Sequence, residues 1–323
     1  MTSDGSQRPP ATWLVLTAFA TVYVIWGSTY LAIRFAVDTL PPFLMGGSRF
    51  FAAGAILFAW TCWQRVPWPR WVEWRDAAIA GTFMLLGGNG GVTWAEKQGI
   101  PSSVAALMVA IVPLWIVLLE WRGGRISRPS LKVFAGLALG FIGVALLVLN
   151  GRGYDGRALN LAGLFALLLS TITWAYGSLF SRRAAKPRSV LQAISLQMLT
   201  GGAIMMLVGA GLGEFSGLDP TTFTAASVGA WLYLMIAGAL IGFTAYAWLL
   251  QVCTPAKVST YAFVNPVIAV ALGCTLGSEP FSLRLVFATA LIAAAVLLII
   301  RGGTNVRHPQ PANTTLLAAG KAT

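Results

Sequence analysis

Two stretches of the sequence repeat one pattern: WGSTYLAIR at residues 26–34 and WAYGSLFSR at residues 174–182. In each stretch a tryptophan is followed eight residues later by an arginine, and a shift of 148 positions superposes them. A similar shift places Trp94 on Trp248. Such internal similarity indicates that the chain contains two copies of one structural unit.

The composition is that of a membrane protein. Of the 323 residues, 57% are hydrophobic and 10% are charged, and the mean hydropathy is +0.75. Soluble domains carry about 25% charged residues, so the sequence excludes a water-soluble globule. The net charge is nevertheless +12, from 22 Lys and Arg against 10 Asp and Glu.

Long apolar runs recur along almost the whole chain. A helix needs about 20 such residues to cross the hydrocarbon core of a bilayer. The runs are continuous and do not alternate with polar residues, which favours helices over barrel strands. The sequence therefore predicts an all-α polytopic membrane protein with ten transmembrane helices, at 13–36, 41–62, 76–96, 101–121, 131–149, 159–181, 189–210, 225–250, 255–277 and 281–301.

Five predicted spans fall in each copy of the repeat. Because five is odd, the two copies must cross the membrane in opposite directions. Inverted repeats of this kind are typical of transporters that work by alternating access around a central site. We expect a short N-terminal tail, a first five-helix repeat, a second five-helix repeat and a C-terminal tail, at 1–12, 13–150, 159–301 and 302–323.

The positive charges predict the orientation. Sixteen of the 22 Lys and Arg residues fall on the side that carries both termini, and six fall on the other side. By the positive-inside rule both termini are expected in the cytoplasm. The cations are spread over several segments at one interface, so they do not form a nucleic-acid-binding element.

Five stretches resemble the EamA family of the drug/metabolite transporter superfamily, and within it the YedA-type exporters. Together with the repeat they cover nearly all of the chain except its tails. They are VIWGSTYLAIR (24–34), GGSRFFAAGAIL (46–57), GNGGVTWAEKQGIPSSVAALMVAIVPL (88–114), WAYGSLFSR (174–182) and YAFVNPVIAVALG (261–273).

The resemblance implies a ten-helix basket in the inner membrane of a bacterium. Spans 1, 3, 4, 6, 8 and 9 would line a central cavity, and spans 5 and 10 would sit outside, where they often contact a partner. The implied activity is efflux of amino acids, other small metabolites or toxic compounds. We therefore expect a small-molecule substrate, contact with membrane lipids, and a monomer or homodimer.

Nothing in the sequence indicates an enzyme. The single histidine, His308, lies in the C-terminal tail, so histidine-based triads and proton relays are excluded. Cys62, Cys253 and Cys274 lack metal-ligand spacing, and we expect no disulfide, metal or cofactor. A membrane receptor or scaffold without transport is the alternative class, and uptake is the alternative to export.

Predicted span 76–96 carries the sharpest polar pattern. Asn89, Thr93 and Glu96 follow at i, i+4 and i+7, which places them on one helical face. Polar groups inside hydrocarbon normally face protein or water, so we expect this face to contact cargo. Glu96 is the candidate proton-coupling residue. The alternative is an interfacial carboxylate that pairs with Lys97 or solvent.

Predicted span 255–277 offers Tyr261 and Asn265 on one face, immediately before Pro266. A proline inside a helix frees the carbonyl four residues earlier, and broken helices at matched depth indicate a binding site in repeat-built transporters. Asn265 is therefore either a cargo contact or a partner for the disrupted local backbone.

Aromatic residues recur in equivalent spans. The candidates for walls around an amphipathic or cationic cargo are Trp26, Tyr30, Trp174, Tyr176 and Tyr246. Ordinary helix packing is the alternative for each.

Arg34 and Arg182 occupy equivalent positions near opposite faces of the membrane. They are candidate gate residues that alternately close the two sides. The alternative is that both extend to lipid headgroups.

Overall fold

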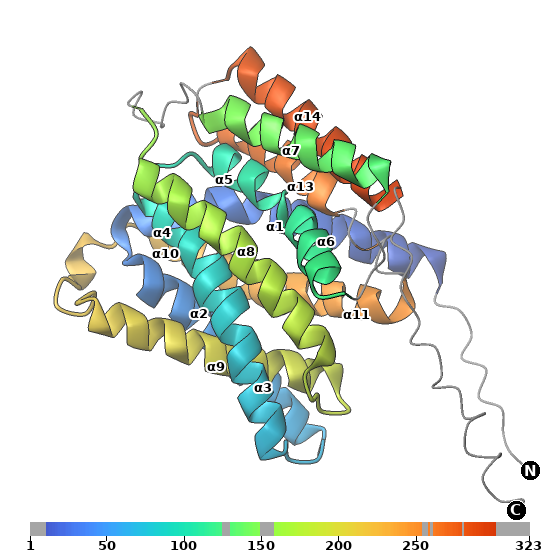
Figure 1. The fold of residues 1–323 in the computed structure, drawn as a ribbon. Coiled ribbons are helices and arrows are strands. Elements are labelled where there is room, and N and C mark those ends of the chain that lie inside the picture. Colours follow the sequence, from blue (N-terminus) through green and yellow to red (C-terminus); the bar gives the residue numbers. More distant parts are fainter. Residues whose placement is uncertain are drawn as a thin grey trace, which may run out of the picture.

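The computed structural model describes residues 11–124, 130–148, 158–253, 258, 261–279 and 281–301. The predicted tails lie almost wholly outside this part of the chain, as do several of the cations that predict the orientation. The described residues fold into helices joined by short connections (Figure 1). These are α1 Thr12–Thr39, α2 Pro42–Trp63, α3 Trp71–Gly81, η1 Thr82–Gly90, α4 Gly91–Lys97, α5 Ser102–Val109, α6 Val112–Arg122, α7 Leu131–Val148, α8 Leu161–Arg183, α9 Val190–Gly211, η2 Pro220–Thr222, α10 Ala225–Tyr233, η3 Leu234–Phe243, α11 Thr244–Val252, α13 Tyr261–Thr275 and α14 Leu283–Arg301.

The all-α class is confirmed, since each of the ten predicted spans contains helix. Among the described residues, six helical segments are long and apolar enough to cross a membrane: Thr12–Thr39, Pro42–Trp63, Ser102–Arg122, Leu161–Arg183, Val190–Gly211 and Ala225–Tyr246. Shorter apolar helices cover Leu131–Leu146, Val264–Thr275 and Leu283–Leu298. Ten crossings and an inverted relation between the halves stay predictions.

Local sequence explains where several helices begin. The side chains of Asn160, Ser189 and Thr224 accept hydrogen bonds from backbone N–H groups in the first turns of α8, α9 and α10. Pro41 and Pro101 precede α2 and α5, where a missing donor has no consequence. Each of these residues satisfies or removes N–H groups that a helix start leaves open.

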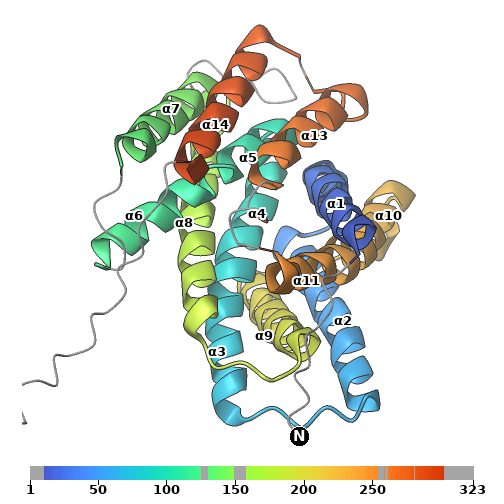
Figure 2. The ribbon, with the colours of Figure 1, turned by 90° about the vertical axis from the view of Figure 1, so that its right-hand side faces the viewer.

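The two halves of the sequence interleave. Helix α2 packs along α9, and α7 packs along α14 at one edge of the bundle (Figures 1 and 2). Glycines allow the backbones of α2 and α9 to approach closely, because a Cβ on Gly202 would lie 2.6 Å from the backbone nitrogen of Phe51. Small residues at such crossings are typical of membrane helices, whose association depends on close packing.

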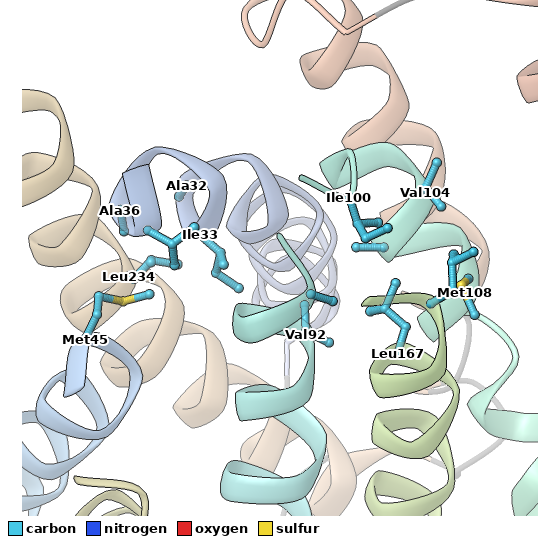
Figure 3. Close-up of a cluster of buried hydrophobic side chains, with 14 of the residues drawn as sticks. Ala32, Ile33, Ala36, Met45, Val92, Ile100, Val104, Met108, Leu167 and Leu234 are labelled. Atoms are coloured by element: carbon cyan, nitrogen blue, oxygen red, sulfur yellow. The ribbon is translucent and has the colours of Figure 1, made fainter. Parts of the chain in front are cut away.

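A buried apolar cluster joins several helices near the end of α1. Figure 3 shows Ile33 of α1 and Val92 of α4 between Met45 and Leu234 on one side and Leu167 on the other. The cluster combines residues from both halves of the chain. It includes Ile33, the neighbour of Arg34 in α1.

In the described part of the chain, two segments are π-helix, η1 and η3. Helices α3, η1 and α4 form one continuous helical run, and α10, η3 and α11 form another. The shift that places Trp94 on Trp248 makes η1 and η3 overlap almost completely. Because π-helix is rare and is frequent at functional sites, its occurrence at equivalent places directs attention to the space between these segments.

Candidate functional site

A central cavity lies between the halves of the chain, with an empty volume of about 920 Å³ including its open part. Its described lining comes from α1, α2, η1, α4, α5, α6, α8, η3 and α13. All six spans that the family resemblance implies contribute, and α2 adds to them. Both π segments reach the cavity, through Gly88 and Asn89 of η1 and through Gly238 and Phe243 of η3.

Aromatic side chains form much of the wall. The indole of Trp26 contacts the rings of Phe243, Tyr246 and Tyr261, with centroid separations of 5.1, 5.0 and 5.3 Å. Its Nε1 donates to the carbonyl of Gly238 at 3.3 Å. The ring is therefore held in one orientation, and it presents a rigid apolar surface to the cavity.

Six of the predicted cargo contacts line this cavity. They are Trp26, Tyr30, Asn89, Trp174, Tyr261 and Asn265. These residues lie far apart in the sequence, and the fold brings them around one space. Their contact with a cargo stays a prediction.

The other four predicted contacts lie outside the lining. Thr93 is fully buried and donates to the carbonyl of Asn89 at 2.8 Å. Tyr246 packs behind the wall against Trp26, and Tyr176 is 47% exposed beside Phe83. The fourth, Glu96, lies toward the end of the bundle that contains Arg34.

The Glu96 side chain is enclosed without a hydrogen-bond partner. The residue is 1% exposed, and neither carboxylate oxygen has a partner among the described residues. The alternative pairing with Lys97 is not formed, because that Nζ donates to the carbonyls of Val37 and Asp38 at 2.6 and 3.0 Å. Glu96 and Lys97 also border a second hollow, whose empty volume is about 600 Å³.

Charged groups surround Glu96 from several elements. Arg34 of α1, Arg49 of α2 and Glu279, which precedes α14, all interact with it electrostatically. Tyr30 of α1 also interacts with it electrostatically. Removal or addition of a proton at Glu96 would therefore change the balance of charge between the central cavity and the Arg34 end.

The two predicted gate arginines bond to carboxylates of the opposite half. Arg34 lies 3.4 Å from Glu279 and also donates to the carbonyl of Gly277. Its equivalent, Arg182, donates to Glu120 at the other end of the bundle. The Arg34 side chain is 17% exposed and that of Arg182 is 55% exposed. The hydrogen bonds and the low exposure of Arg34 do not fit a side chain that extends to lipid headgroups.

Glu279 was not among the predicted site residues. Its side chain is fully buried and accepts hydrogen bonds from the backbone nitrogens of Ser102 and Ser103, at 2.7 and 3.1 Å, and from both serine hydroxyls. It therefore ties the start of α5 to Arg34. No sequence spacing indicates this contact, because its partners lie 177 and 245 positions away.

Asn265 bonds to the backbone. With its amide nitrogen facing the neighbouring carbonyls, it donates to Tyr261 at 3.2 Å and to Tyr23 at 3.3 Å. These acceptors are not the carbonyl of Ala262, which lies four residues before Pro266, and Asn265 also lines the cavity. Whether Asn265 contacts a cargo stays a prediction.

Sequence reasoning also missed Arg49, Ser170 and Thr171, which line the cavity. Arg49 is one of the six cations counted on the side opposite the termini, and its side chain lies inside the bundle at 2% exposure. The signal was available, because an arginine within an apolar run is costly and normally faces a protein interior or a water-filled path.

The family model of the EamA-like transporter family matches residues 12–149 and 161–301. The chain belongs to this family. It is similar to the uncharacterized inner membrane transporter YedA of Escherichia coli (strain K12), with 36% identity over 88% of this chain and 90% of that protein. Membership of this family, the similarity to an inner membrane transporter and the apolar helices support a multi-pass inner membrane transporter.

More distant EamA-like relatives align over similar lengths. Protein PecM of Dickeya dadantii is 26% identical over 85% of this chain and 88% of its own. A probable amino-acid metabolite efflux pump of Salmonella typhimurium is 23% identical over 87% and 93%. A solved crystal structure superposes with a TM-score of 0.61 at 22% identity, over 88% of this chain and 95% of that one, which supports the fold.

Proposed function

We propose that this protein is a secondary transporter that exports small amphipathic metabolites, such as amino acids or related compounds, or toxic drugs, across the inner membrane. The observation that carries the proposal is the central cavity, whose wall combines residues from both halves of the chain. A site between two repeats is what alternating access requires, because rocking of one repeat against the other opens the site to each side in turn.

The two arginine–carboxylate pairs supply the gates in this scheme. Arg34 with Glu279 closes one end, and Arg182 with Glu120 closes the other. Each pair joins the two halves, so each must break when the halves rock apart at that end. The greater exposure of the Arg182 pair indicates that it opens more readily.

The orientation follows from the charge distribution. With both termini in the cytoplasm, the Arg34 end faces the periplasm and the Arg182 end faces the cytoplasm. A cargo would then enter past Arg182 and leave past Arg34. The Salmonella typhimurium relative is called a probable amino-acid metabolite efflux pump, which agrees with export.

The oligomeric state is proposed to be a monomer or a homodimer. Helices α7 and α14 lie at the edge of the bundle (Figure 2). Their exposed apolar side chains include Phe141, Ile142 and Phe287. These surfaces suit lipid chains or a second copy equally.

Transport is tested by flux in proteoliposomes that contain the purified protein and a panel of radiolabelled amino acids, aromatic acids and cationic drugs. We expect faster release of at least one compound than from protein-free liposomes. The Trp26→Ala variant should slow this release about tenfold or more, because stacking and burial against an aromatic wall contribute on the order of 1–3 kcal/mol.

The matched control is Trp60→Ala, since that side chain is 48% exposed and contacts Trp63 away from the cavity. It should leave the flux within about twofold. No movement of any compound would favour the receptor or scaffold class over transport. Equal loss of flux in both tryptophan variants would place the path elsewhere.

A further inference from the structure

We infer that the central cavity binds an organic anion, with its anionic group on Arg49 and its apolar body against the aromatic wall. Arg49 of α2 is the one charged side chain among the described residues that line the cavity, and the residue is 2% exposed. A charged side chain held at this depth is expensive and marks substrate paths by default. This inference deepens the proposed function and rests on it for the transport role of the site.

The guanidinium of Arg49 has unused bonding capacity. Its Nη2 donates to Oδ1 of Asn89, and its Cζ lies 4.5 Å from the ring centroid of Phe50. Its Nε is buried and has no partner among the described residues. An arginine carries five N–H donors in a fixed fork that matches a carboxylate with two parallel bonds, and a buried donor without an acceptor is costly. A carboxylate in the cavity would remove that cost.

Among the described residues no carboxylate lies within 4.0 Å of the Arg49 guanidinium. The carboxylate that interacts with it electrostatically is Glu96 of α4. Among the described residues the ion pairs within 4.0 Å involve Arg34, Arg70, Arg75 and Arg182, but not Arg49. When Glu96 carries a proton, the charge of Arg49 is left for a ligand to neutralise.

The other lining residues indicate the chemistry of the part of the ligand that does not contact Arg49. Trp26, Tyr30, Trp174 and Tyr261 offer aromatic faces, and no Asp or Glu is among the described lining residues. A cation would therefore meet a like charge without a compensating carboxylate. The aromatic wall alone suggested an amphipathic or cationic cargo, whereas Arg49 favours an anion with a flat or apolar body.

Binding to the purified full-length protein in detergent tests the inference without requiring transport. The probes are three carboxylate–amide pairs of equal shape: indole-3-acetate and indole-3-acetamide, phenylacetate and phenylacetamide, and octanoate and octanamide. Tryptamine serves as the cationic probe. Affinity is measured by quenching of intrinsic fluorescence for the aliphatic pair and by calorimetry for the aromatic compounds.

We expect at least one carboxylate to bind about tenfold to hundredfold more tightly than its amide, as charge-assisted hydrogen bonds allow. Tryptamine should bind more weakly than indole-3-acetate. In Arg49→Gln the carboxylate and its amide should bind equally, and Arg49→Lys should retain part of the preference. The matched control is Arg188→Gln, which removes one positive charge at an exposed position and should keep the full preference.

The inference would be overturned if, in all three pairs, the wild-type protein bound the carboxylate and the amide equally tightly or bound neither. Tighter binding of tryptamine than of indole-3-acetate would also overturn it. These outcomes do not depend on whether Arg49→Gln folds. Anion-selective binding together with no flux in proteoliposomes would retain the anion site and remove the transport proposal. Flux in proteoliposomes without any preference for anions in binding would retain the transport proposal and remove the anion site.

Discussion

Replacement of Glu279 by alanine should lower the stability of the protein by about 3–5 kcal/mol, the usual cost of removing one partner of a buried ion pair. The substitution leaves the Ser102 and Ser103 backbone nitrogens without their acceptor and removes the carboxylate that faces Arg34. For a chain of this size the apparent melting temperature in detergent should fall by about 5–10 °C, measured by intrinsic tryptophan fluorescence.

The matched control is Glu120→Ala at the opposite end of the bundle. Glu120 also pairs with an arginine, Arg182, but that side chain is 55% exposed. Exposed pairs contribute about 0–1 kcal/mol, so the melting temperature should change by about 2 °C or less. Similar losses in both variants would contradict the assignment of Glu279 as the more tightly held gate partner.

Replacement of Glu96 by glutamine should abolish the dependence of transport on a pH gradient while downhill flux of the cargo continues. The substitution keeps the shape of the side chain and removes its titratable group. The ionised form of an enclosed carboxylate without hydrogen-bond donors is costly, so a proton is expected to accompany Glu96 in one conformation and to leave it in another. The measurement compares flux in proteoliposomes with and without an imposed pH gradient.

Asp219→Asn is the control for loss of a carboxylate, since Asp219 is exposed and bonds within its own turn, to Thr221. It should retain the full response to the gradient. Retention of that response by Glu96→Gln would rule out proton coupling at this residue. A facilitator driven by the cargo gradient alone would then be the better description.

Much of the fold was accessible from sequence because it depends on local patterns. Continuous apolar runs predict helices wherever the backbone has to satisfy its own hydrogen bonds in lipid. The duplicated tryptophan and arginine at 26–34 and 174–182 predicted two equivalent units, and the π segments η1 and η3 later fell at equivalent places. The glycine-rich run at 87–91 lies in η1 and at the start of α4, but glycine content alone does not specify π-helix.

The candidate site was predictable only in part. Helical periodicity shows which residues share one face of a helix, but it does not show which of them reach the cavity. Asn89, Thr93 and Glu96 share one face, yet only Asn89 reaches the central cavity. Thr93 bonds back to its own helix and Glu96 lies near the Arg34 end. Arg49 was counted only as an orientation signal, since its distance from the start of an apolar run does not reveal whether the side chain turns inward.

The contact between Glu279 and the start of α5 was beyond sequence reasoning for a different reason. It joins residues 177 positions apart, and its geometry depends on how α13 and α14 pack against the first half. Pairwise contacts of this kind follow from the tertiary arrangement and not from any local pattern. The same holds for the pairing of Arg182 with Glu120, although each residue lies near the end of a predicted span.

Thiol labelling from each side of the membrane tests most directly whether the central cavity is a path with alternating access. Val109 of α5 lines the cavity, whereas Leu107 of the same helix is fully buried in the apolar core. In a background without Cys62, Cys253 and Cys274, the Val109→Cys variant should react with a membrane-impermeant methanethiosulfonate added from either side of oriented vesicles. The Leu107→Cys variant should react from neither side. Labelling of Val109→Cys from one side only, or from neither, would contradict alternating access to this cavity.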